Sequence, residues 1–296
     1  MSSDPAAPLS PVVVAVVAAH NAPADLPARC AELAPQVAST VIVDDGTFSV
    51  DAADYASHPT HVVSLQENRG IAGALNAGVA RARSQGATHV LVLDQDSRVA
   101  PGYVAAGLDV FRAEEAAGVR LVAAVPETVE NERITVLRDG RPFDPIQSGQ
   151  LMSVAAIAQV GAFADDFVID SVDSEYTLRA RGAGYEFAVV PGSDLEHTLG
   201  EPSPLVLFGR HLTLLGKPRF RRYHRPFRTY YMVRNGLTLW RRHHRGNLGW
   251  LVHRTAFMLV DVSFNTLTAP DRWQQLRAGL RGLRDAARGR MGAIRP

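Results

Sequence analysis

The first half of the chain alternates between apolar runs and segments with helical spacing. Runs rich in Val, Ile and Leu occupy residues 11–21, 39–47, 60–70 and 88–96. Small and apolar residues recur at helical spacing over about 25–37, 70–86 and 101–117. Strands that alternate with helices predict a parallel, doubly wound sheet, in which ligands bind beyond the carboxyl ends of the strands.

The same architecture continues less regularly through the middle of the chain. A further strand is expected over about 120–128. The stretch "DSEYTLRARGAG" predicts a helix that starts near Asp173, and "YEFAVVPGSDLEH" predicts a strand that ends at His197. We therefore expect an α/β fold over residues 11–225, preceded by a disordered N-terminus over residues 1–10.

The last third of the chain shows apolar stripes at helical spacing among many arginines. Two sets of apolar residues follow the spacing i, i+3, i+7, i+10, namely Tyr230, Val233, Leu237 and Trp240, and Trp273, Leu276, Leu280 and Leu283. The segment 248–269 is also apolar, but its His253, Arg254 and Asp261 argue against a membrane span. We predict a basic amphipathic helical region over 226–296, which either packs on the rest of the fold or lies on an anionic membrane surface.

Composition narrows the class of protein. With 46% hydrophobic and 21% charged residues among 296, the chain has the composition of an ordinary globular protein. Cys30 is the only cysteine, which excludes a disulfide framework and a cysteine-based metal site. The N-terminal segment lacks the basic region of a signal peptide, so we expect a cytoplasmic protein.

The net charge of +1 conceals a strong asymmetry between the two ends of the chain. Residues 1–200 carry 12 Arg against 26 Asp and Glu, a net charge of −14. Residues 201–296 carry 19 Lys and Arg against 4 Asp and Glu, a net charge of +15. Such a split predicts a basic face for an anionic partner, which could be a membrane surface, a nucleic acid or a diphosphate. Of these three we do not expect a nucleic acid.

Polar side chains collect where the four predicted strands end. They are His20, Asn21, Asp44, Asp45, Asn68, Asp94 and Asp96. Because the carboxyl ends of parallel strands share one rim of the sheet, we expect these groups to lie together. Neighbouring carboxylates such as Asp94 and Asp96 repel each other unless a cation or solvent takes up the charge. The sequence contains neither a GxGxxG fingerprint after the first strand nor a GxxxxGK[ST] loop, so a nucleotide would be held in another way.

Each of these signals has a structural alternative when it is taken alone. Asp94 and Asp96 could form a solvated acidic turn. Asp173 lies at the expected start of a helix, where a carboxylate caps the helix and faces the positive end of its dipole. His197 follows a strand and could be an ordinary turn or core histidine. The residues by themselves leave these alternatives open.

A series of motifs in one order changes how these residues are interpreted. They are "VAAHNAPADL", "VDDGT", "ENRGIAGALNAG", "LVLDQDS", "SGQLMSVAAIAQVGAFADDFVIDSVDSEYTLRARGAGY", "HTLGE" and "RTYYMVRN". Over about residues 12–240 the series resembles the family 2 glycosyltransferases, which have the GT-A fold, and most closely their bacterial rhamnosyltransferase branch. The chain departs from the family at residues 44–47, where Asp-Asp-Gly-Thr stands in place of the frequent Asp-Asn-Gly-Ser.

The resemblance implies a GT-A-type, Rossmann-like and mostly parallel sheet flanked by helices, with the basic helices as a C-terminal extension. It divides the catalytic domain into a nucleotide-sugar half over 11–117 and an acceptor and catalytic half over 118–225.

The resemblance also implies a role for each candidate residue. Donor binding falls to His20, Asn21, Asp44, Asp45, Asn68, Gly70, Asn76 and Asp94. Asp94, Asp96 and His197 would bind Mg²⁺ or Mn²⁺. Asp173 would be the general base, and Glu175 would support it or touch the acceptor. Acceptor binding falls to Ser148, Gly149, Arg234 and Asn235, with Arg234 pairing with the acceptor's diphosphate.

The chemistry agrees with these roles. A divalent cation offsets the charge that develops on a leaving diphosphate, and direct inversion needs one carboxylate to take the proton of the acceptor hydroxyl. We therefore expect an inverting, metal-dependent transferase that moves L-rhamnose from dTDP-β-L-rhamnose to a cell-envelope glycan or a polyprenyl-diphosphate-linked sugar. It would be peripheral on the inner face of the cell membrane.

Three alternatives stay open at this point. The donor could be a UDP-hexose or a galactofuranose nucleotide. The protein could instead be a non-catalytic carbohydrate- or membrane-binding protein on the same scaffold. The protein could also assemble into a homo-oligomer.

Overall fold

A computed structural model describes residues 10–197, 201–204, 206–207, 210–211, 213–214, 217–218 and 220–294. For residues 201–222 it describes the backbone only. Nearly all of the N-terminus predicted to be disordered lies outside these residues, and so do residues 198–200 of the "HTLGE" motif.

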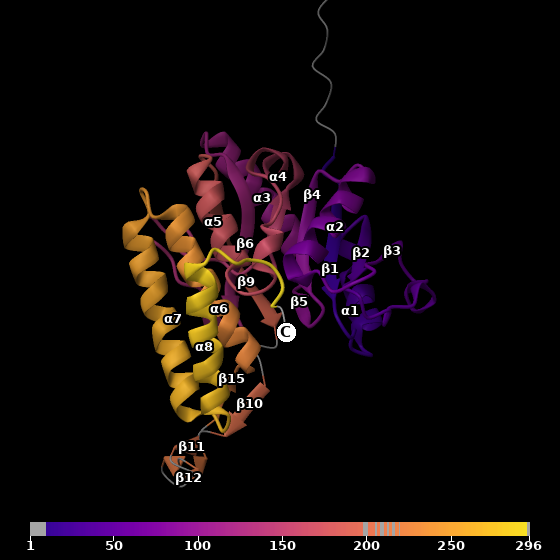
Figure 1. Ribbon diagram of the computed structural model, residues 1–296. Helices are drawn as coiled ribbons and strands as arrows, with labels where there is room; N and C mark the ends of the chain where they lie inside the picture. The colour runs from indigo at the N-terminus through magenta and orange to yellow at the C-terminus, as the bar shows by residue number, and fades with distance from the viewer. Residues whose placement is uncertain are drawn as a thin grey trace, which may run out of the picture.

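One nine-stranded sheet forms the centre of the described chain (Figure 1). Its strands are β1 (Val13–Ala19), β2 (Ser39–Asp44), β3 (Thr60–Ser64), β4 (His89–Asp94), β5 (Ser97–Val99), β6 (Leu121–Val129), β7 (Glu132–Arg133), β8 (Leu151–Ser153) and β9 (Glu186–His197). The order across the sheet is β3-β2-β1-β4-β8-β6-β9-β5, and β7 pairs with β6. The pairs β3–β2, β2–β1, β1–β4 and β6–β9 are parallel, so the predicted doubly wound, mostly parallel sheet is confirmed.

Helices cover both faces of this sheet. They are α1 (Leu26–Leu33), α2 (Gly70–Ser84), α3 (Tyr103–Ala116), α4 (Val154–Val160) and α5 (Val172–Gly182). Side chains that alternate along β1 enter two different cores: Val14 and Val16 pack with residues of α2, α4 and α5, while Val13, Ala15 and Val17 pack with residues of α1 and α3. A strand buried on both faces is a continuous apolar run, which explains the Val-rich sequence of β1.

Small residues let α2 lie close against the strands. A Cβ atom at Gly78 would collide with the side chain of Val16. The face of α2 toward the sheet is otherwise made of residues such as Ala72, Ala74 and Ala82, all of them buried. This packing sets the height of the N-terminus of α2 above the rim of the sheet.

Three helices form a separate layer at the C-terminal end (Figure 1). They are α6 (Pro226–His243), α7 (Leu248–Thr268) and α8 (Arg272–Ala287). Contact between α6 and α8 is close, because a Cβ atom at Gly282 would lie 2.6 Å from the carbonyl oxygen of Tyr230. Within the described residues, no helix combines the length and the hydropathy that a membrane span requires.

Four elements of the central fold were not anticipated. They are the short strands β5, β7 and β8 and the helix α4. Of these, β5 matters most, because it pairs antiparallel with the end of β9 and places Ser97 opposite His197. The pairing joins two segments that lie a hundred residues apart in sequence.

Candidate active site

The loops that follow β1, β2 and β3 meet at one rim of the sheet. The ring Nδ1 of His20 lies 3.1 Å from the carbonyl oxygen of Asp45, and the Asn68 amide nitrogen lies 3.2 Å from the same ring atom. Asp45 accepts a hydrogen bond from the backbone N–H of Arg69 at 2.7 Å. The predicted convergence of these polar residues is present in the structure.

The first acidic residue of the "VDDGT" motif organises a loop. Asp44 is fully buried, and its carboxylate accepts hydrogen bonds from the backbone N–H groups of Thr47, Phe48, Ser49 and Val50. Those four donors and the Thr47 hydroxyl occupy both carboxylate oxygens, and they lower the pKa of Asp44 although burial opposes its ionisation. Asp44 thus shapes the loop that a donor would meet, and its own contact with the donor stays a prediction.

Thr47 also ties the first two loops together. Its hydroxyl oxygen accepts from the backbone N–H of Asn21 at 3.2 Å and lies 2.8 Å from the hydroxyl of Ser49. Ser49 in turn accepts from the backbone N–H of Ala22 at 2.9 Å. The hydroxyl of the last residue in the Asp-Asp-Gly-Thr sequence therefore supports the loop of His20 and Asn21.

The structure explains why a glycine and an asparagine stand at Gly70 and Asn76, two of the predicted donor-binding residues in α2. Gly70 has a φ of +72°, and a Cβ atom there would collide with the carbonyl oxygen of Val168. Asn76 donates to the carbonyl of Phe163 and accepts from its N–H, both at 2.9 Å. Both amide atoms of Asn76 thus bind the backbone and connect α2 to the segment before α5, and its role on the sugar side stays a prediction.

The carboxylates after β4 meet a histidine from β9. Asp94, Asp96 and His197 each present one possible ligand atom, and these atoms lie within 4.8 Å of one another. Nδ1 of His197 lies 3.2 Å from an oxygen of Asp96, and Nε2 lies 3.9 Å from an oxygen of Asp94. Two carboxylates and an imidazole suit Mg²⁺ or Mn²⁺, so the residues fit the predicted cation.

The electrostatics of the cluster favour added positive charge. Burial raises the pKa of Asp94, and the neighbouring Asp96 raises it further, against the effect of His197. Burial opposes protonation of His197, but the hydrogen bond to Asp96 and the two carboxylates outweigh it and raise the pKa of the imidazole. The three side chains therefore share a site that attracts a cation.

Buried polar groups hold this cluster from behind. The Ser148 hydroxyl accepts from the backbone N–H of Asp94 at 3.0 Å and donates to the Ser97 hydroxyl at 2.7 Å, and the Ser97 hydroxyl lies 2.8 Å from Nδ1 of His197. Gln95 forms a pair of hydrogen bonds with the backbone of His20, at 2.9 and 3.2 Å. These contacts fix the turn in the orientation that brings both carboxylates together.

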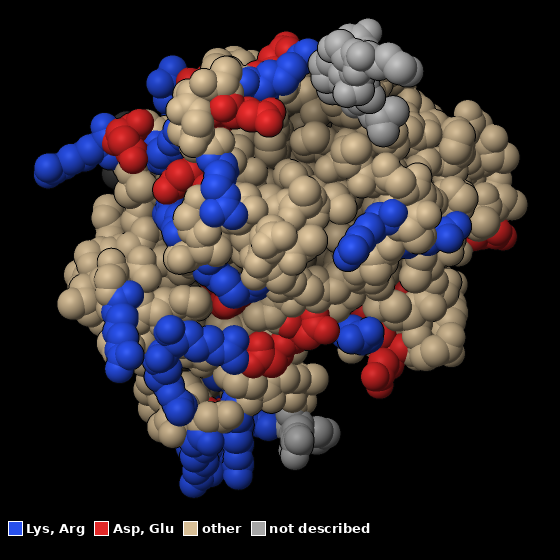
Figure 2. Space-filling view, turned by 90° about the horizontal axis from the view of Figure 1, so that it is seen from above, with Lys and Arg blue, Asp and Glu red and all other residues tan. Residues whose placement is uncertain are grey.

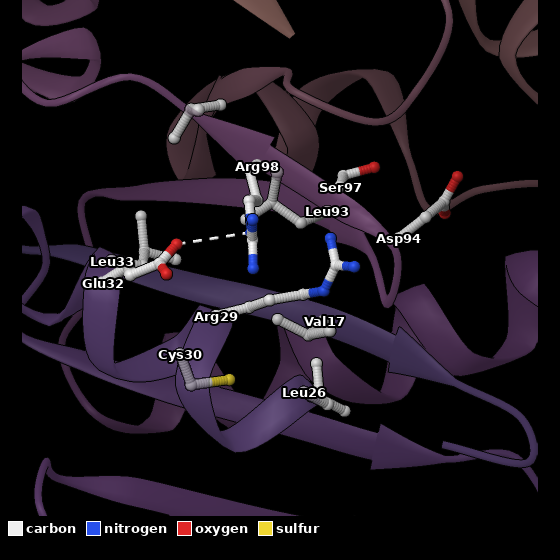
Figure 3. A pocket seen from close by; sticks show the side chains of 11 residues that line it. Val17, Leu26, Arg29, Cys30, Glu32, Leu33, Leu93, Asp94, Ser97 and Arg98 are labelled. Atoms are coloured by element: carbon white, nitrogen blue, oxygen red, sulfur yellow. Dashed lines mark ion pairs between the residues drawn. The ribbon is translucent and has the colours of Figure 1, made fainter. Parts of the chain in front are cut away.

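A small cavity lies beside the turn, between α1 and β5 (Figure 3). Its volume is about 20 Å³, enough for about one water molecule and far too little for a nucleotide. Arg29 and Arg98 reach into it from opposite sides. Arg29 donates to the carbonyl oxygen of Asp96 at 2.9 Å and forms an ion pair with Asp25 at 2.7 Å. The cavity is therefore part of the support of the turn.

A second acidic cluster lies at the N-terminus of α5. Asp173 is half-buried, and its carboxylate accepts from the backbone N–H of Ser174 at 2.8 Å. The Ser174 hydroxyl donates to Asp144 at 2.9 Å, and Arg254 of α7 donates to Asp144 at 2.6 Å. Burial, with the nearby charge of Asp144, raises the pKa of Asp173 to about 7. A carboxylate that titrates near neutral pH suits a general base.

The segment before α5 has an unusual backbone. Val168, Asp170 and Ser171 all have φ between 61° and 67°, a region that side chains other than glycine rarely adopt. Asn235 holds the segment by donating to the carbonyls of Phe167, Ile169 and Asp170 at 2.8–3.0 Å. Such strain persists only where the surroundings enforce it, and it is common at functional sites.

Glu175 does not share the environment of Asp173. It is buried, and Arg179 grips its carboxylate with nitrogen–oxygen distances of 2.8–3.2 Å. Nε2 of His243 lies 3.4 Å away, at ion-pair distance. Although burial opposes ionisation, these two partners lower the pKa of Glu175 to about 2. Residues two apart on a helix face different sides. Glu175 therefore forms an ion pair within the fold, and its role beside the base stays a prediction.

The four predicted acceptor contacts also serve the fold. Arg234 and Asn235 are fully buried, and the guanidinium of Arg234 donates to the carbonyls of Phe167 and Gly292 at 3.1 and 2.5 Å. Ser148 is 1% exposed and faces the backbone of Asp94.

Gly149 completes the set. It has a φ of +84°, and a Cβ atom there would lie 2.7 Å from the ring of Pro126. All four are buried and engaged within the fold in this structure, and their contact with an acceptor stays a prediction.

One short segment links the two acidic clusters. Asp144 contacts Ser174 and Arg254, and three residues later the Gln147 amide donates to Asp94 at 3.4 Å. Residues 144–147 therefore connect the cation cluster to the cluster around Asp173. Sequence analysis missed Asp144, Gln147 and Arg254, because they lie outside the motifs that resemble the family.

Comparisons with known proteins agree with this geometry. A model of the family "Glycosyl transferase family 2" matches residues 14–162. The chain is 26% identical over 300 residues to the dTDP-rhamnosyl transferase RfbF of Shigella flexneri, which covers 96% of this chain and 98% of that protein.

Solved structures show a similar fold. The crystal structure of S. aureus TarS 1–349 has a TM-score of 0.57 and 13% identity, and covers 93% of this chain and 80% of that one. The same fragment in complex with UDP-GlcNAc has a TM-score of 0.51 and 11% identity, and covers 94% and 92% of the two chains. The predicted GT-A-type fold and the family resemblance are both confirmed: the chain belongs to glycosyl transferase family 2 and is a glycosyltransferase that resembles a rhamnosyltransferase over nearly its whole length.

Proposed function

We propose that the protein transfers L-rhamnose from dTDP-β-L-rhamnose, with inversion, to a glycan or a polyprenyl-diphosphate-linked sugar of the cell envelope. The observation that carries the donor is the full-length similarity to a dTDP-rhamnosyl transferase. The observation that carries the chemistry is the convergence of Asp94, Asp96 and His197, which residues 144–147 connect to the cluster around Asp173.

Different residues at the rim of the sheet would bind different parts of the donor. The loops of His20, Asn21, Asp45 and Asn68 would hold the nucleoside. Asp94, Asp96 and His197 would bind Mg²⁺ or Mn²⁺, which offsets the charge of the leaving diphosphate when it is bound. Backbone N–H groups at the start of α2 (Gly70–Ser84) point toward the same rim and favour a negative group.

Asp173 would take the proton of the acceptor hydroxyl. With a pKa of about 7, an appreciable fraction of the carboxylate is ionised at neutral pH, and its basicity is higher than that of an ordinary aspartate. Because Asp173 would act from the face of the sugar opposite the leaving diphosphate, the anomeric configuration would invert. The charge of Arg254, which Asp144 holds in position, would attract the carboxylate.

The C-terminal helices support an acceptor at a membrane. Seven large apolar side chains of α7 are exposed, namely Leu248, Val252, Phe257, Leu259, Val260, Phe264 and Leu267. On α8 the exposed apolar side chains are Trp273, Leu276, Leu280 and Leu283. Both of these sets belong to the part of the chain with a net charge of +15.

Charge complementarity favours one occupant for this apolar surface. Lys and Arg gather at the lower left of Figure 2, on the side where α7 and α8 lie in Figure 1. Exposed apolar residues flanked by arginines are typical of helices that lie on an anionic leaflet. We therefore propose that the protein is peripheral on the inner face of the cell membrane, with the active site next to a lipid-linked acceptor.

A donor screen tests the proposed reaction. The protein is incubated with Mn²⁺ or Mg²⁺ and each of a panel of nucleotide sugars, and release of nucleoside diphosphate is measured with and without an envelope glycan or lipid-linked acceptor. The expected result is release from dTDP-β-L-rhamnose above all others. Preferential release from a UDP-hexose or a galactofuranose donor would overturn the donor, and no release from any donor would favour the non-catalytic alternative.

A further inference from the structure

The starting point is an arginine that lies between the two acidic clusters. Arg228 is the third residue of α6, and its guanidinium forms two hydrogen bonds with Asp170, at 2.5 and 3.3 Å. Asp170 is almost buried, with 9% of its side chain exposed, whereas 37% of the Arg228 side chain is exposed. The carboxylate thus anchors the guanidinium from inside while part of it remains open to a ligand.

The charge of Arg228 reaches both clusters. It acts on Asp94 of the cation cluster and, together with Asp170, on Asp173 at the start of α5. Asp170 stands three residues before Asp173, on the segment that Asn235 holds in a strained conformation. The position of the guanidinium is therefore built into the fold.

The two acidic clusters contain more negative than positive groups, so a positively charged side chain between them is favourable. Five carboxylates belong to the two clusters: Asp94, Asp96, Asp144, Asp170 and Asp173. Arg254 is engaged by Asp144 at 2.6 Å. The two hydrogen bonds of Arg228 use Nε and Nη2, and Nη1 has no hydrogen-bond partner among the described residues. A guanidinium with a free N–H edge binds phosphate oxygens strongly.

We propose that Arg228 contacts the diphosphate of the donor, and so shares with the cation cluster the stabilisation of the leaving nucleoside diphosphate. This inference rests on the proposed function. It is separate from the predicted pairing of Arg234 with the diphosphate of the acceptor, since Arg234 is fully buried. No covalent step is added: the guanidinium donates N–H bonds to oxygens that gain charge as the glycosidic bond breaks.

The test is the affinity of the protein for dTDP in the presence of Mn²⁺, measured by calorimetry for the wild type and for Arg228→Gln. Loss of a charged hydrogen bond should weaken dTDP binding about ten- to a hundredfold. Binding of thymidine, which has no phosphate, should change by less than about twofold, since the nucleoside loops are untouched. Arg228→Lys should recover part of the lost affinity, because lysine restores the charge but not the bidentate geometry of the guanidinium.

Two controls separate this role from a purely structural one. Arg242 lies on the same helix, is 36% exposed and pairs with Asp166, so Arg242→Gln is the matched control and should bind dTDP like the wild type. Asp170→Asn removes the anchor but keeps the guanidinium, so it should bind dTDP far better than Arg228→Gln. Equal losses of dTDP and thymidine affinity in Arg228→Gln would assign Arg228 to folding alone and overturn the inference.

The remaining outcomes are also distinguishable. If the wild type binds dTDP and Arg228→Gln binds it equally well, the inference is wrong and the proposed function stands. If the wild type binds no dTDP at all in Mn²⁺ or Mg²⁺, the proposed donor is wrong and the inference falls with it.

Discussion

Two pairs of acidic residues have the same spacing but different outcomes. Asp94 and Asp96 are two residues apart in a turn after β4, and both contact the ring of His197. Asp173 and Glu175 are also two residues apart, in the first turn of α5. There the two carboxylates separate: Asp173 joins Asp144 and Arg254, and Glu175 pairs with Arg179.

The difference lies in the local backbone. In the turn after β4, β5 pairs with β9, and this pairing brings a histidine between two carboxylates that would otherwise repel each other. On a helix, successive residues rotate by about 100°, so positions i and i+2 face almost opposite sides. Identical spacing in the sequence therefore produces one shared site in a turn and two separate environments in a helix. Substitutions at these four positions test this comparison directly.

The largest effect is expected at the turn. Asp96→Asn removes one of three cation ligands and should lower kcat by about 1,000-fold or more, since a bound cation contributes several kcal/mol to charge stabilisation. Chelation of the wild type with EDTA should have an effect of the same size. Rhamnosyl transfer from dTDP-rhamnose is the measurement, and Asp109→Asn on the exposed surface of α3 is the control. Full activity in chelator would remove the cation from the reaction.

The next effect is expected at the first acidic residue of α5. Asp173→Asn keeps the size of the side chain but removes its basicity, and should lower kcat by about 100- to 10,000-fold while dTDP binding persists. The same substitution should leave the stability of the folded protein unchanged or increase it. Because burial raises the pKa of Asp173 to about 7, folding is disfavoured as pH rises from the unfolded value of 3.8 through about 7. Asp173→Asn should therefore unfold at a temperature equal to or above that of the wild type at pH 8. An active but less stable variant would assign Asp173 to helix capping alone.

The pH profile examines the same group without a substitution. A base must be deprotonated to accept the acceptor proton, so kcat/KM of the wild type should rise with pH and level off above a midpoint near 7. The residual activity of Asp173→Asn should lack this rise. A wild-type profile that is flat between pH 5.5 and 8 would contradict the assignment.

A smaller effect is expected at the second acidic residue of α5, and it should be on stability. Glu175→Gln leaves Arg179 and His243 without their carboxylate and should cost about 1–3 kcal/mol of folding free energy, while kcat changes by less than about threefold. Because the pKa of Glu175 is lowered from 4.5 to about 2, the advantage of the wild type is present above pH 4.5 and is lost as pH falls toward 2.

Thermal unfolding at several pH values measures this advantage. The exposed Glu32, which pairs with Arg98, provides the control Glu32→Gln. A loss of activity in Glu175→Gln as large as that in Asp173→Asn would mean that the two residues act together after all.

The sequence was most informative where one element determines the position of a residue. Continuous Val-rich runs predict strands buried on both faces, and the carboxyl ends of parallel strands must share a rim, so the meeting of His20, Asp45, Asn68 and Asp94 could be anticipated. The family motifs added His197, whose ring does lie beside Asp94 and Asp96.

The sequence was least informative where a side chain could be used in two ways. Arg234 has the right chemistry for a diphosphate, but the direction of α6 points it at the carbonyls of residues 166–167, and only the packed structure shows this. The same holds for Ser148 and Asn76, whose polar atoms are consumed by backbone groups. Arg228 lies in the same motif as Arg234, six residues earlier, and a helix turns it to a different side.

The smallest effect on turnover is expected from α8, where the question is again which side of a helix a residue faces. Gln275 and Asp285 are buried against α6, where they bond Thr229 and Tyr230, whereas Leu276 and Leu280 face outward, 42% and 56% exposed. If this outer side lies on a membrane, the double substitution Leu276→Asp, Leu280→Asp should weaken co-sedimentation with anionic phosphatidylglycerol vesicles by about tenfold or more. Transfer to a soluble acceptor should stay within about twofold of the wild type.

The control for this variant is Val136→Asp, at a residue that is 49% exposed outside the C-terminal helices. Wild-type binding should require anionic lipid and fall as salt rises, because the arginines beside the leucines act through screened charge. Equal recovery of wild-type protein in the supernatant with and without anionic vesicles would contradict membrane binding. If the wild type then ran as a dimer on gel filtration and the double variant as a monomer, the exposed leucines would instead belong to an interface between two copies of the chain.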